Sequence, residues 1–369
     1  MKSFFNKVYV IVFCGVLATL TALLIIIPDK AFSEKENRTL MQAPVITTQK
    51  FLSGEYTTRL AAYFADQFPF RDTFVGCKAY SELLQGKAQN NGVIYAKCDV
   101  LIPRAETGDM RLGENLNIIS EFSESTKAEI IIAALPRTVD VFSEILPKSY
   151  PQTDNYKIWE DFNSEVNDLR LNTLDLYDVL CDSNAYYRTD HHYTTQGAYL
   201  TYELLGDKLG YTPKQETFFS KDTVTTEFCG TSMRTSGFYL AKKDEITLFR
   251  YDGDLDYTVV ADGEQIQIYD FSKLDTTDKY AVFLGGNHAR VDIKGNTSNR
   301  EKLLIIRDSF ADSIAPFLAL HFDLTLIDLR YYSDSISALI EEEEIGRVLF
   351  LQNITELATA KNFSYLKMQ

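Results

Sequence analysis

The sequence predicts an α/β protein with a mostly parallel sheet, preceded by one helix long enough to cross a membrane. Three observations support this. Strand-like and helix-like segments alternate along most of the chain, which is typical of layered α/β folds. A run of uncharged, mostly apolar residues at 8–27 stands behind two lysines. Short β-like segments separated by turn residues occupy about 212–278, which we interpret as a β-rich insertion.

The first thirty residues predict where the rest of the chain lies. The apolar run is long enough to cross a bilayer as a helix. Lys2 and Lys7 precede it, which favours a cytoplasmic N-terminus and an external remainder. A cleaved signal peptide is the alternative, although the following "PDKAFSEK" offers no good small-x-small cleavage site. We expect an uncleaved anchor in residues 1–30.

The remaining chain has the composition of one large globular domain. Of 369 residues, 45% are hydrophobic and 13% aromatic, enough to build a sizeable core. The net charge of −15 argues against a nucleic-acid partner, because phosphates require clustered Lys and Arg. Residues 31–49 are mostly polar and contain Pro44, which is typical of a linker. We therefore expect the domain over 50–369.

Four of the five cysteines follow the apolar run. The sequence has no CxxC pair, so a thiolate zinc site is not expected. Two disulfides and four reduced thiols are both compatible with the spacing. The four residues are Cys77, Cys98, Cys181 and Cys229.

The elements of the domain are predicted in chain order from periodicity and turn residues. Apolar residues at three- and four-residue steps predict helices over 50–88, interrupted at Pro69, and a hairpin follows over 90–104. Further helices are expected at 112–125, 156–168, 194–210, 311–322 and 333–344. Strands are expected at 128–136, 172–180, 279–287, 302–307, 323–332 and 346–353.

The stretch "LLIIRDSFADS" places Ser309 between a buried strand and a helix. Active sites of open α/β sheets lie at the carboxyl ends of strands. The backbone N–H groups of Ser309 and of its neighbour Phe310 can point there at a developing oxyanion. Capping of the helix by Asp308 or Ser309 is the simpler alternative.

The stretch "YYRTDHHYTTQGAY" supplies what a serine nucleophile needs. A nucleophilic serine requires a base within hydrogen-bond reach, and the base requires an orienting group on its other nitrogen. Asp190 and His192 are two residues apart, so in an extended loop their side chains point the same way. His192 can then contact Ser309 while Asp190 holds the other ring nitrogen. His191 is expected to point away.

Other residues after strands are candidates for contact with substrate. Arg330 follows one strand and can stabilise negative charge, with a surface ion pair as the alternative. Asn353 ends the last strand and can donate to an oxyanion, with helix capping as the alternative. A metal site is the competing chemistry, because a DHH run also occurs in manganese phosphoesterases. Those enzymes need further ligands, and only Asp308, His288 and His321 are obvious here.

Several stretches resemble the DHHW family. "TDHHYTTQGAY" resembles its signature, with Tyr193 in place of the tryptophan that names the family. "RDSF" resembles the serine site that this family shares with SGNH/GDSL-type hydrolases. "SEKENRTL", "ADQFPFRDTF" and "NNGVIYAKCDVLI" resemble the entry to the DHHW domain, and the resemblance covers about 30–365. The alginate O-acetyltransferases, with an Asp-x-His motif upstream of their serine, are similar more distantly.

The resemblance implies an SGNH-like three-layer sandwich with Ser309 as nucleophile, His192 as base and Asp190 as orienting acid. Tyr193 would form an aromatic wall of the pocket. The implied activity is that of a membrane-anchored, extracytoplasmic serine O-acyltransferase or esterase without a cofactor. Its substrate would be the O-acetyl groups of a cell-envelope polysaccharide, and a membrane-bound O-acyltransferase is a candidate acyl donor. A non-catalytic glycan-binding protein is the alternative, since aromatic rings stack on sugars.

Overall fold

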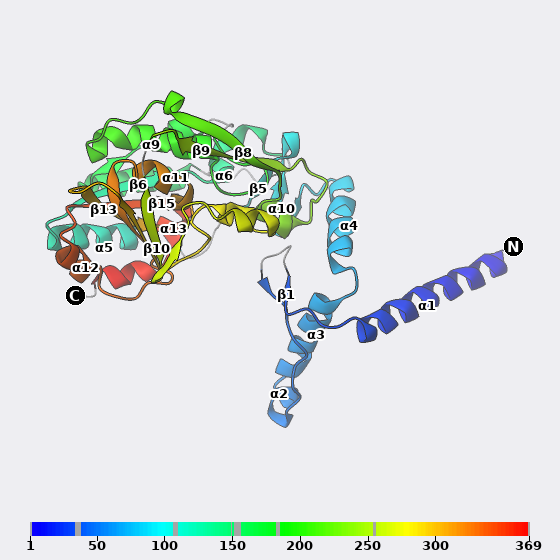
Figure 1. Ribbon diagram of the computed structural model, residues 1–369. Coiled ribbons are helices and arrows are strands. Elements are labelled where there is room, and N and C mark those ends of the chain that lie inside the picture. Colours follow the sequence, from blue (N-terminus) through cyan, green and yellow to red (C-terminus); the bar gives the residue numbers. More distant parts are fainter. Residues whose placement is uncertain are drawn as a thin grey trace.

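The computed structural model describes residues 2–33, 38–105, 110–148, 150, 156–181, 185–253 and 256–367. An α/β domain is preceded by helices that stand away from it (Figure 1). The first of them, α1 (Lys2–Ile26), includes an apolar stretch, Phe4–Ile26, of 23 residues that is long enough to cross a membrane. None of that stretch is buried against the described part of the chain.

An eight-stranded mixed sheet forms the centre of the domain. Its strand order is β11-β10-β12-β14-β13-β15-β6-β7. The five strands from β14 to β7 run parallel, whereas β12, β10 and β11 are antiparallel to their neighbours. The strands are β6 (Glu129–Leu135), β7 (Thr173–Leu174), β10 (Tyr257–Ala261), β11 (Glu264–Ile266), β12 (Arg290–Gly295), β13 (Glu301–Arg307), β14 (Phe322–Ile327) and β15 (Arg347–Asn353).

Both faces of the central strands are buried, which explains their continuous apolar sequences. Successive side chains of β13 alternate between two cores: Leu303 and Ile305 pack on one side, Leu304 and Ile306 on the other. The first face is covered by α9 (Thr195–Leu209) and α11 (Ala311–Leu318). The second is covered by α5 (Leu112–Ser125), α7 (Lys157–Asp168), α12 (Ile336–Glu343) and α13 (Ile354–Thr359). The predicted three-layer α/β fold with a mostly parallel sheet is confirmed.

The predicted β-rich span, 212–278, contributes to two sheets. β8 (Phe219–Phe228) and β9 (Asp244–Tyr251) form a separate antiparallel ribbon. This ribbon lies along α9, where Phe219 and Phe249 contact Tyr199. β10 and β11 instead extend the central sheet. The short helix α10 (Thr231–Ser236) lies between β8 and β9 in the sequence and borders the site described below.

The chain between α1 and the sheet forms helices and two small antiparallel sheets. The helices are α2 (Thr48–Leu52), α3 (Glu55–Gln67) and α4 (Arg71–Leu84), with the predicted break at Pro69. The small sheets consist of β1 (Phe32–Ser33) with β2 (Arg38–Thr39), and of β3 (Gln89–Asn90), β4 (Val93–Tyr95) and β5 (Leu101–Pro103). Part of "SEKENRTL", residues 34–37, lies outside the described residues. The division into linker, domain and insertion remains a prediction.

Two element predictions are wrong. Residues 172–180 form only the two-residue strand β7 and then the helix α8 (Tyr177–Leu180), because the Asp175 carboxylate accepts the Tyr177 N–H and starts a helical turn. Residues 279–287 form a 3₁₀ turn, η5 (Lys279–Val282), and a loop instead of a strand. The remaining elements are η1 (Lys97–Asp99), α6 (Thr138–Val141), η2 (Ser143–Ile145), η3 (Glu216–Phe218), η4 (Phe271–Asp275) and η6 (Asn362–Lys367).

All five cysteines lie in the described part of the chain, and none of them is paired. Cys77 and Cys98 are exposed, whereas Cys181 and Cys229 are partly buried. Of the two possibilities left open by the sequence, two disulfides or four reduced thiols, the structure has the four reduced thiols.

Candidate active site

A cavity of about 450 Å³ opens at the carboxyl ends of the parallel strands. β13 ends at Arg307 and releases Asp308 and Ser309 into this cavity, and β15 brings Asn353 to the same edge. The short helix α10 contributes Thr231 from the opposite side. The cavity thus occupies the position where ligands bind in open α/β sheets.

Ser309, His192 and Asp190 form a continuous chain of hydrogen bonds. The His192 Nε2 lies 2.7 Å from Ser309 Oγ, and the Nδ1 lies 2.5 Å from Asp190 Oδ1. Asp190 and His192 are buried. The structure therefore brings Ser309 next to His192, although the two residues are 117 positions apart in sequence. The distances are those that a serine nucleophile and its base require.

The Asp190 carboxylate is held by backbone groups as well as by imidazole. Its Oδ2 accepts the N–H of Thr231 at 2.6 Å, and Oδ1 accepts the N–H of His192 at 3.1 Å. Burial alone raises the pKa of Asp190, but His191, His192 and these hydrogen bonds together hold that pKa well below its usual range. The group is therefore ionised and oriented at neutral pH.

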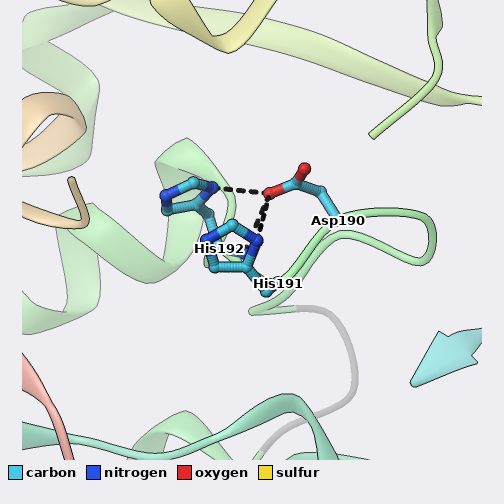
Figure 2. A group of neighbouring side chains, drawn as sticks. All are labelled: Asp190, His191 and His192. Atoms are coloured by element: carbon cyan, nitrogen blue, oxygen red, sulfur yellow. Dashed lines mark hydrogen bonds and ion pairs between the residues drawn. The ribbon is translucent and has the colours of Figure 1, made fainter. Parts of the chain in front are cut away.

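His191 does not point away from the site, contrary to the sequence prediction. Residues 188–192 form a bend rather than an extended strand, so the alternation of side chains does not apply. The His191 ring packs on that of His192 with centroids 3.9 Å apart, and it lines the cavity. Figure 2 shows both imidazole rings directed at the same Asp190 oxygen.

Asp190, His191 and His192 are also the one group in the described chain whose donor atoms lie close enough together to hold a metal. Both ring nitrogens of His192 are already used, one by Asp190 and the other by Ser309. A cation would have to displace these contacts. Of the other ligands considered from sequence, Asp308 lines the cavity but its two oxygens accept the backbone N–H groups of Phe310 and Asn353. The remaining two lie elsewhere: His288 contacts Asp262, and His321 contacts Tyr202. The donor set therefore fits a hydrogen-bonded chain better than a metal cage.

Tyr280 packs against one face of the His192 ring, a contact that the sequence did not predict. Its ring stacks on His192 with centroids 3.9 Å apart and planes inclined by 7°. Its hydroxyl donates to the Ser309 carbonyl at 3.2 Å and contacts Ser313 Oγ at 3.1 Å. Tyr280 therefore touches both the base and the backbone of the serine. The segment 279–287 that carries it gave only a strand signal.

A second, partly buried carboxylate, that of Asp244, holds the loop that carries Asp190. Asp244 accepts the N–H groups of Arg188 and Thr189 and the Thr189 hydroxyl, at 2.6–3.0 Å. Burial raises the pKa of Asp244 despite these bonds. The Thr189 hydroxyl in turn accepts the N–H of Gly230 at 3.0 Å, next to Thr231. β9 and α10 thus fix the 189–192 loop, although nothing in the sequence linked them to it.

Ser309 does not cap the following helix. α11 has no side-chain cap, and the Ser309 hydroxyl faces His192. Asp308 instead accepts the N–H groups of Phe310 at 2.9 Å and Asn353 at 2.7 Å, so the predicted Phe310 donor is occupied. Among the described residues the Ser309 N–H has no acceptor. It is therefore the backbone donor available at this position.

Of the remaining candidate residues for contact with substrate, Arg330 and Asn353 line the cavity and Tyr193 does not. Arg330 lines the cavity and is ion-paired with Asp328, while its Nη1 has no acceptor among the described residues. Asn353 also lines the cavity, but it caps α13 through Oδ1 and donates to the Pro136 carbonyl at 3.1 Å. Tyr193 is fully buried and donates to the Phe310 carbonyl at 2.7 Å. Tyr193 therefore supports the serine turn from behind instead of forming a cavity wall.

Comparisons with known proteins place this fold in a defined group. A family model described as DHHW protein matches residues 156–327, which include Asp190, His192 and Ser309. The crystal structure of a DHHW family protein from Eubacterium siraeum DSM 15702 has a TM-score of 0.64 at 20% identity, covering 76% of this chain and 96% of that chain. No curated protein gives a significant match. The resemblance stated from the sequence is confirmed.

Two further structures belong to Bacillus cereus PatB1. One matches with a TM-score of 0.61 at 19% identity, covering 74% of this chain and 99% of that chain. The other, with a sulfonyl adduct, matches with a TM-score of 0.57 at 20% identity, covering 69% of this chain and 90% of that chain. The O-acetyltransferase domain of Pseudomonas putida AlgJ is more distant, with a TM-score of 0.48 at 13% identity, covering 75% of this chain and 98% of that chain. The PatB1 structures share the fold of this chain.

Proposed function

We propose that this chain, of which residues 156–327 match the DHHW family model, is a membrane-anchored, extracytoplasmic serine O-acyltransferase or esterase. The observation that carries this proposal is the contact chain from Asp190 through His192 to Ser309 at the edge of an open cavity. Such a chain is the arrangement by which a base activates a serine hydroxyl.

The proposed reaction has two balanced halves. The Ser309 oxygen attacks an ester carbonyl while His192 Nε2 takes the hydroxyl proton, and the ester C–O bond then breaks as the leaving alcohol receives that proton. An acceptor hydroxyl next attacks the acyl-serine and gives its proton to His192, which passes that proton to the Ser309 oxygen as the acyl–serine bond breaks. A sugar hydroxyl as acceptor makes the protein a transferase, and water makes it an esterase. Asp190 stays ionised and stabilises the imidazolium throughout.

Developing negative charge on the carbonyl oxygen needs a donor. The free N–H of Ser309 is placed for this role, and the unpaired Nη1 of Arg330 is a second candidate in the same cavity. Asn353 and Phe310 are weaker candidates, because Asn353 Nδ2 already donates to Pro136 and the Phe310 N–H to Asp308.

The substrate and the compartment are the finer parts of the proposal. The similarity of the Asp-x-His stretch upstream of Ser309 to that of the alginate O-acetyltransferases supports an acetyl group and an envelope polysaccharide. The 23-residue apolar helix supports a membrane anchor, with a membrane-bound O-acyltransferase as donor partner.

A sulfonyl fluoride tests the proposal directly, because it reacts with an activated serine and needs no natural substrate. We expect one adduct per chain, on Ser309, in the full-length protein. Ser309→Ala should abolish the adduct and lower p-nitrophenyl acetate turnover by several orders of magnitude, on the order of 10⁴ or more. The matched control is Ser232→Ala, because Ser232 borders the same cavity and its buried hydroxyl has no partner among the described residues.

The glycan-binding alternative makes the opposite prediction. It requires no adduct on Ser309 and an undiminished affinity for the envelope glycan in Ser309→Ala. Labelling that persists in Ser309→Ala at the wild-type rate would refute the assigned nucleophile. Mass spectrometry of the labelled peptide distinguishes these outcomes, with the melting temperature recorded for each variant.

A further inference from the structure

The helices between α1 and the catalytic domain carry apolar side chains that no part of the described chain covers. Neither α2 nor α3 contains a buried residue. A helix of thirteen residues, the length of α3, is only marginally stable alone in water. We name four exposed phenylalanines at the end of α3 and the start of α4 the aromatic patch: Phe64, Phe68, Phe70 and Phe74.

The geometry of the α3–α4 corner presents this patch outward. Phe68 and Phe74 pack edge to face, with centroids 5.6 Å apart. Phe70, between Pro69 and α4, has a left-handed backbone with φ of 58° and is 63% exposed. A bulky residue rarely adopts that conformation. Three of the four patch residues, Phe68, Phe70 and Phe74, belong to "ADQFPFRDTF", a stretch that the proposed active site does not use, and Phe64 directly precedes it.

Hydrogen bonds tie the C-terminal half of α3, next to the patch, to the chain that leaves α1. Lys30 N–H donates to Gln67 Oε1 at 2.9 Å, and Gln67 Nε2 donates back to the Lys30 carbonyl at 3.0 Å. The Tyr63 hydroxyl donates to Asp29 at 3.0 Å. Asp29 follows the end of α1 by three residues, a span of at most about 10 Å. A membrane crossed by α1 therefore ends close to the C-terminal half of α3.

The charge distribution is compatible with a membrane at this place. Residues 28–84 hold seven basic and seven acidic side chains, so they are neutral. Residues 85–369 hold 28 basic and 45 acidic side chains. An anionic bilayer surface would repel the domain but not the neutral segment. Neutral charge and exposed Phe side chains are suited to the interface between headgroups and acyl chains.

We propose that the aromatic patch inserts into the interface of the same bilayer that α1 crosses. This rests on the proposed anchor. The second half of α4 is packed on the catalytic domain: Ala79 is buried beside Phe238, and Gly76 lies against Tyr239. Insertion of the patch therefore fixes the catalytic domain, and with it the cavity, at a set height and orientation above the membrane.

Tryptophan quenching by brominated lipids tests this with the full-length chain. The protein is placed in phosphatidylcholine–phosphatidylglycerol vesicles, with and without bromine on the acyl chains. The only native tryptophan, Trp159, is buried in the core and supplies a constant background. The test variants are Phe70→Trp and, at a second position of the patch, Phe74→Trp. Phe218→Trp is the matched control, since Phe218 is 51% exposed on the domain. Val12→Trp reports on α1.

We expect brominated lipid to quench Val12→Trp and both patch variants at least twofold, and Phe218→Trp hardly at all. Quenching of Val12→Trp with patch variants no more quenched than Phe218→Trp would overturn the proposal while leaving the anchor intact. Unquenched Val12→Trp with a quenched patch would refute the anchor but retain the membrane contact. A patch emission that is blue-shifted yet unquenched would mean that a second copy covers the patch, which also overturns the proposal.

Discussion

Tyr280 contacts two residues of the candidate active site without being part of the hydrogen-bonded chain from Asp190 to Ser309. Its ring covers one face of His192, and its hydroxyl holds the backbone carbonyl of Ser309. In the proposed mechanism, one side chain therefore positions the base His192 and the nucleophile Ser309 relative to each other. A residue that acts in this way is a positioning residue, and its replacement changes turnover through the alignment of others.

We expect Tyr280→Leu to lower kcat for p-nitrophenyl acetate by about 10²-fold, the usual cost of misplacing a reacting group by about 1 Å. Tyr280→Phe keeps the stacked ring and loses only the hydroxyl contacts, so its loss should be several times smaller. Steady-state kinetics with KM and melting temperature measured in parallel checks this. Equal loss in both variants, or a lower melting temperature with normal kcat in the folded protein, would contradict the positioning role.

Gly230 is required by close approach, not by its backbone angle. A Cβ at this position would lie 2.4 Å from both the Asp190 Cβ and the Thr189 carbonyl oxygen. Gly230→Ala must therefore displace the 189–192 loop, and overpacking of this kind costs about 1–3 kcal/mol. We expect a lower melting temperature and strongly reduced sulfonyl labelling of Ser309. Gly346→Ala is the control, because its Cβ meets nothing within 4 Å; a Gly230→Ala protein that labels like Gly346→Ala would refute this explanation.

The three residues of the contact chain could be predicted from sequence, and their supports could not. Asp190 and His192 are two residues apart in sequence, and Ser309 follows a recognisable buried strand. Tyr280 and Asp244 reach the site only through tertiary packing of η5 and β9. Their local sequences carry no periodicity or motif that points to a partner about 30–100 residues away.

At the scale of elements, the sequence predicted long periodic segments best. α5, α9 and β6 agree with their predicted ranges within about two residues, because the two helices have a buried face and β6 is a continuous buried apolar run. The 279–287 segment is also apolar, but its residues Tyr280, Val282 and Phe283 fill a small cluster outside the central sheet. A buried turn and a buried strand have the same apolar composition, so periodicity could not separate them.

The helix α9 begins directly after the site loop, and its cap links the two. The Thr194 hydroxyl accepts the Gly197 N–H at 3.3 Å and contacts the Ala185 carbonyl. Thr194→Ala should lower the free energy of unfolding by about 1 kcal/mol through loss of this cap. Thr194→Ser keeps the oxygen and should recover most of the loss. Urea unfolding of both variants measures the difference, and equal stability of the Ala and Ser variants would show that the cap contributes nothing.

At the scale of the whole molecule, α1 is the part that the rest of the chain does not bury. Helices α2–α4 and the α/β domain leave all of its apolar stretch open, as its projection from the molecule illustrates (Figure 1). An apolar helix of this length needs an apolar environment, which a bilayer provides and water does not. The same helix is compatible with a signal sequence, and processing of the chain decides between the two.

We expect the mature chain to retain α1. The full-length protein should stay in the membrane pellet after an alkaline carbonate wash, and its N-terminal sequence should begin at Met1 or Lys2. Leu17→Arg, near the middle of the apolar stretch, should weaken insertion by about 2.5–3.5 kcal/mol, whereas Leu17→Ile should have little effect. These variants separate membrane insertion from general destabilisation, because Leu17 lies outside the folded domain. A mature protein that begins after about residue 28 would overturn the anchor, since removal of a signal sequence leaves no membrane-spanning segment.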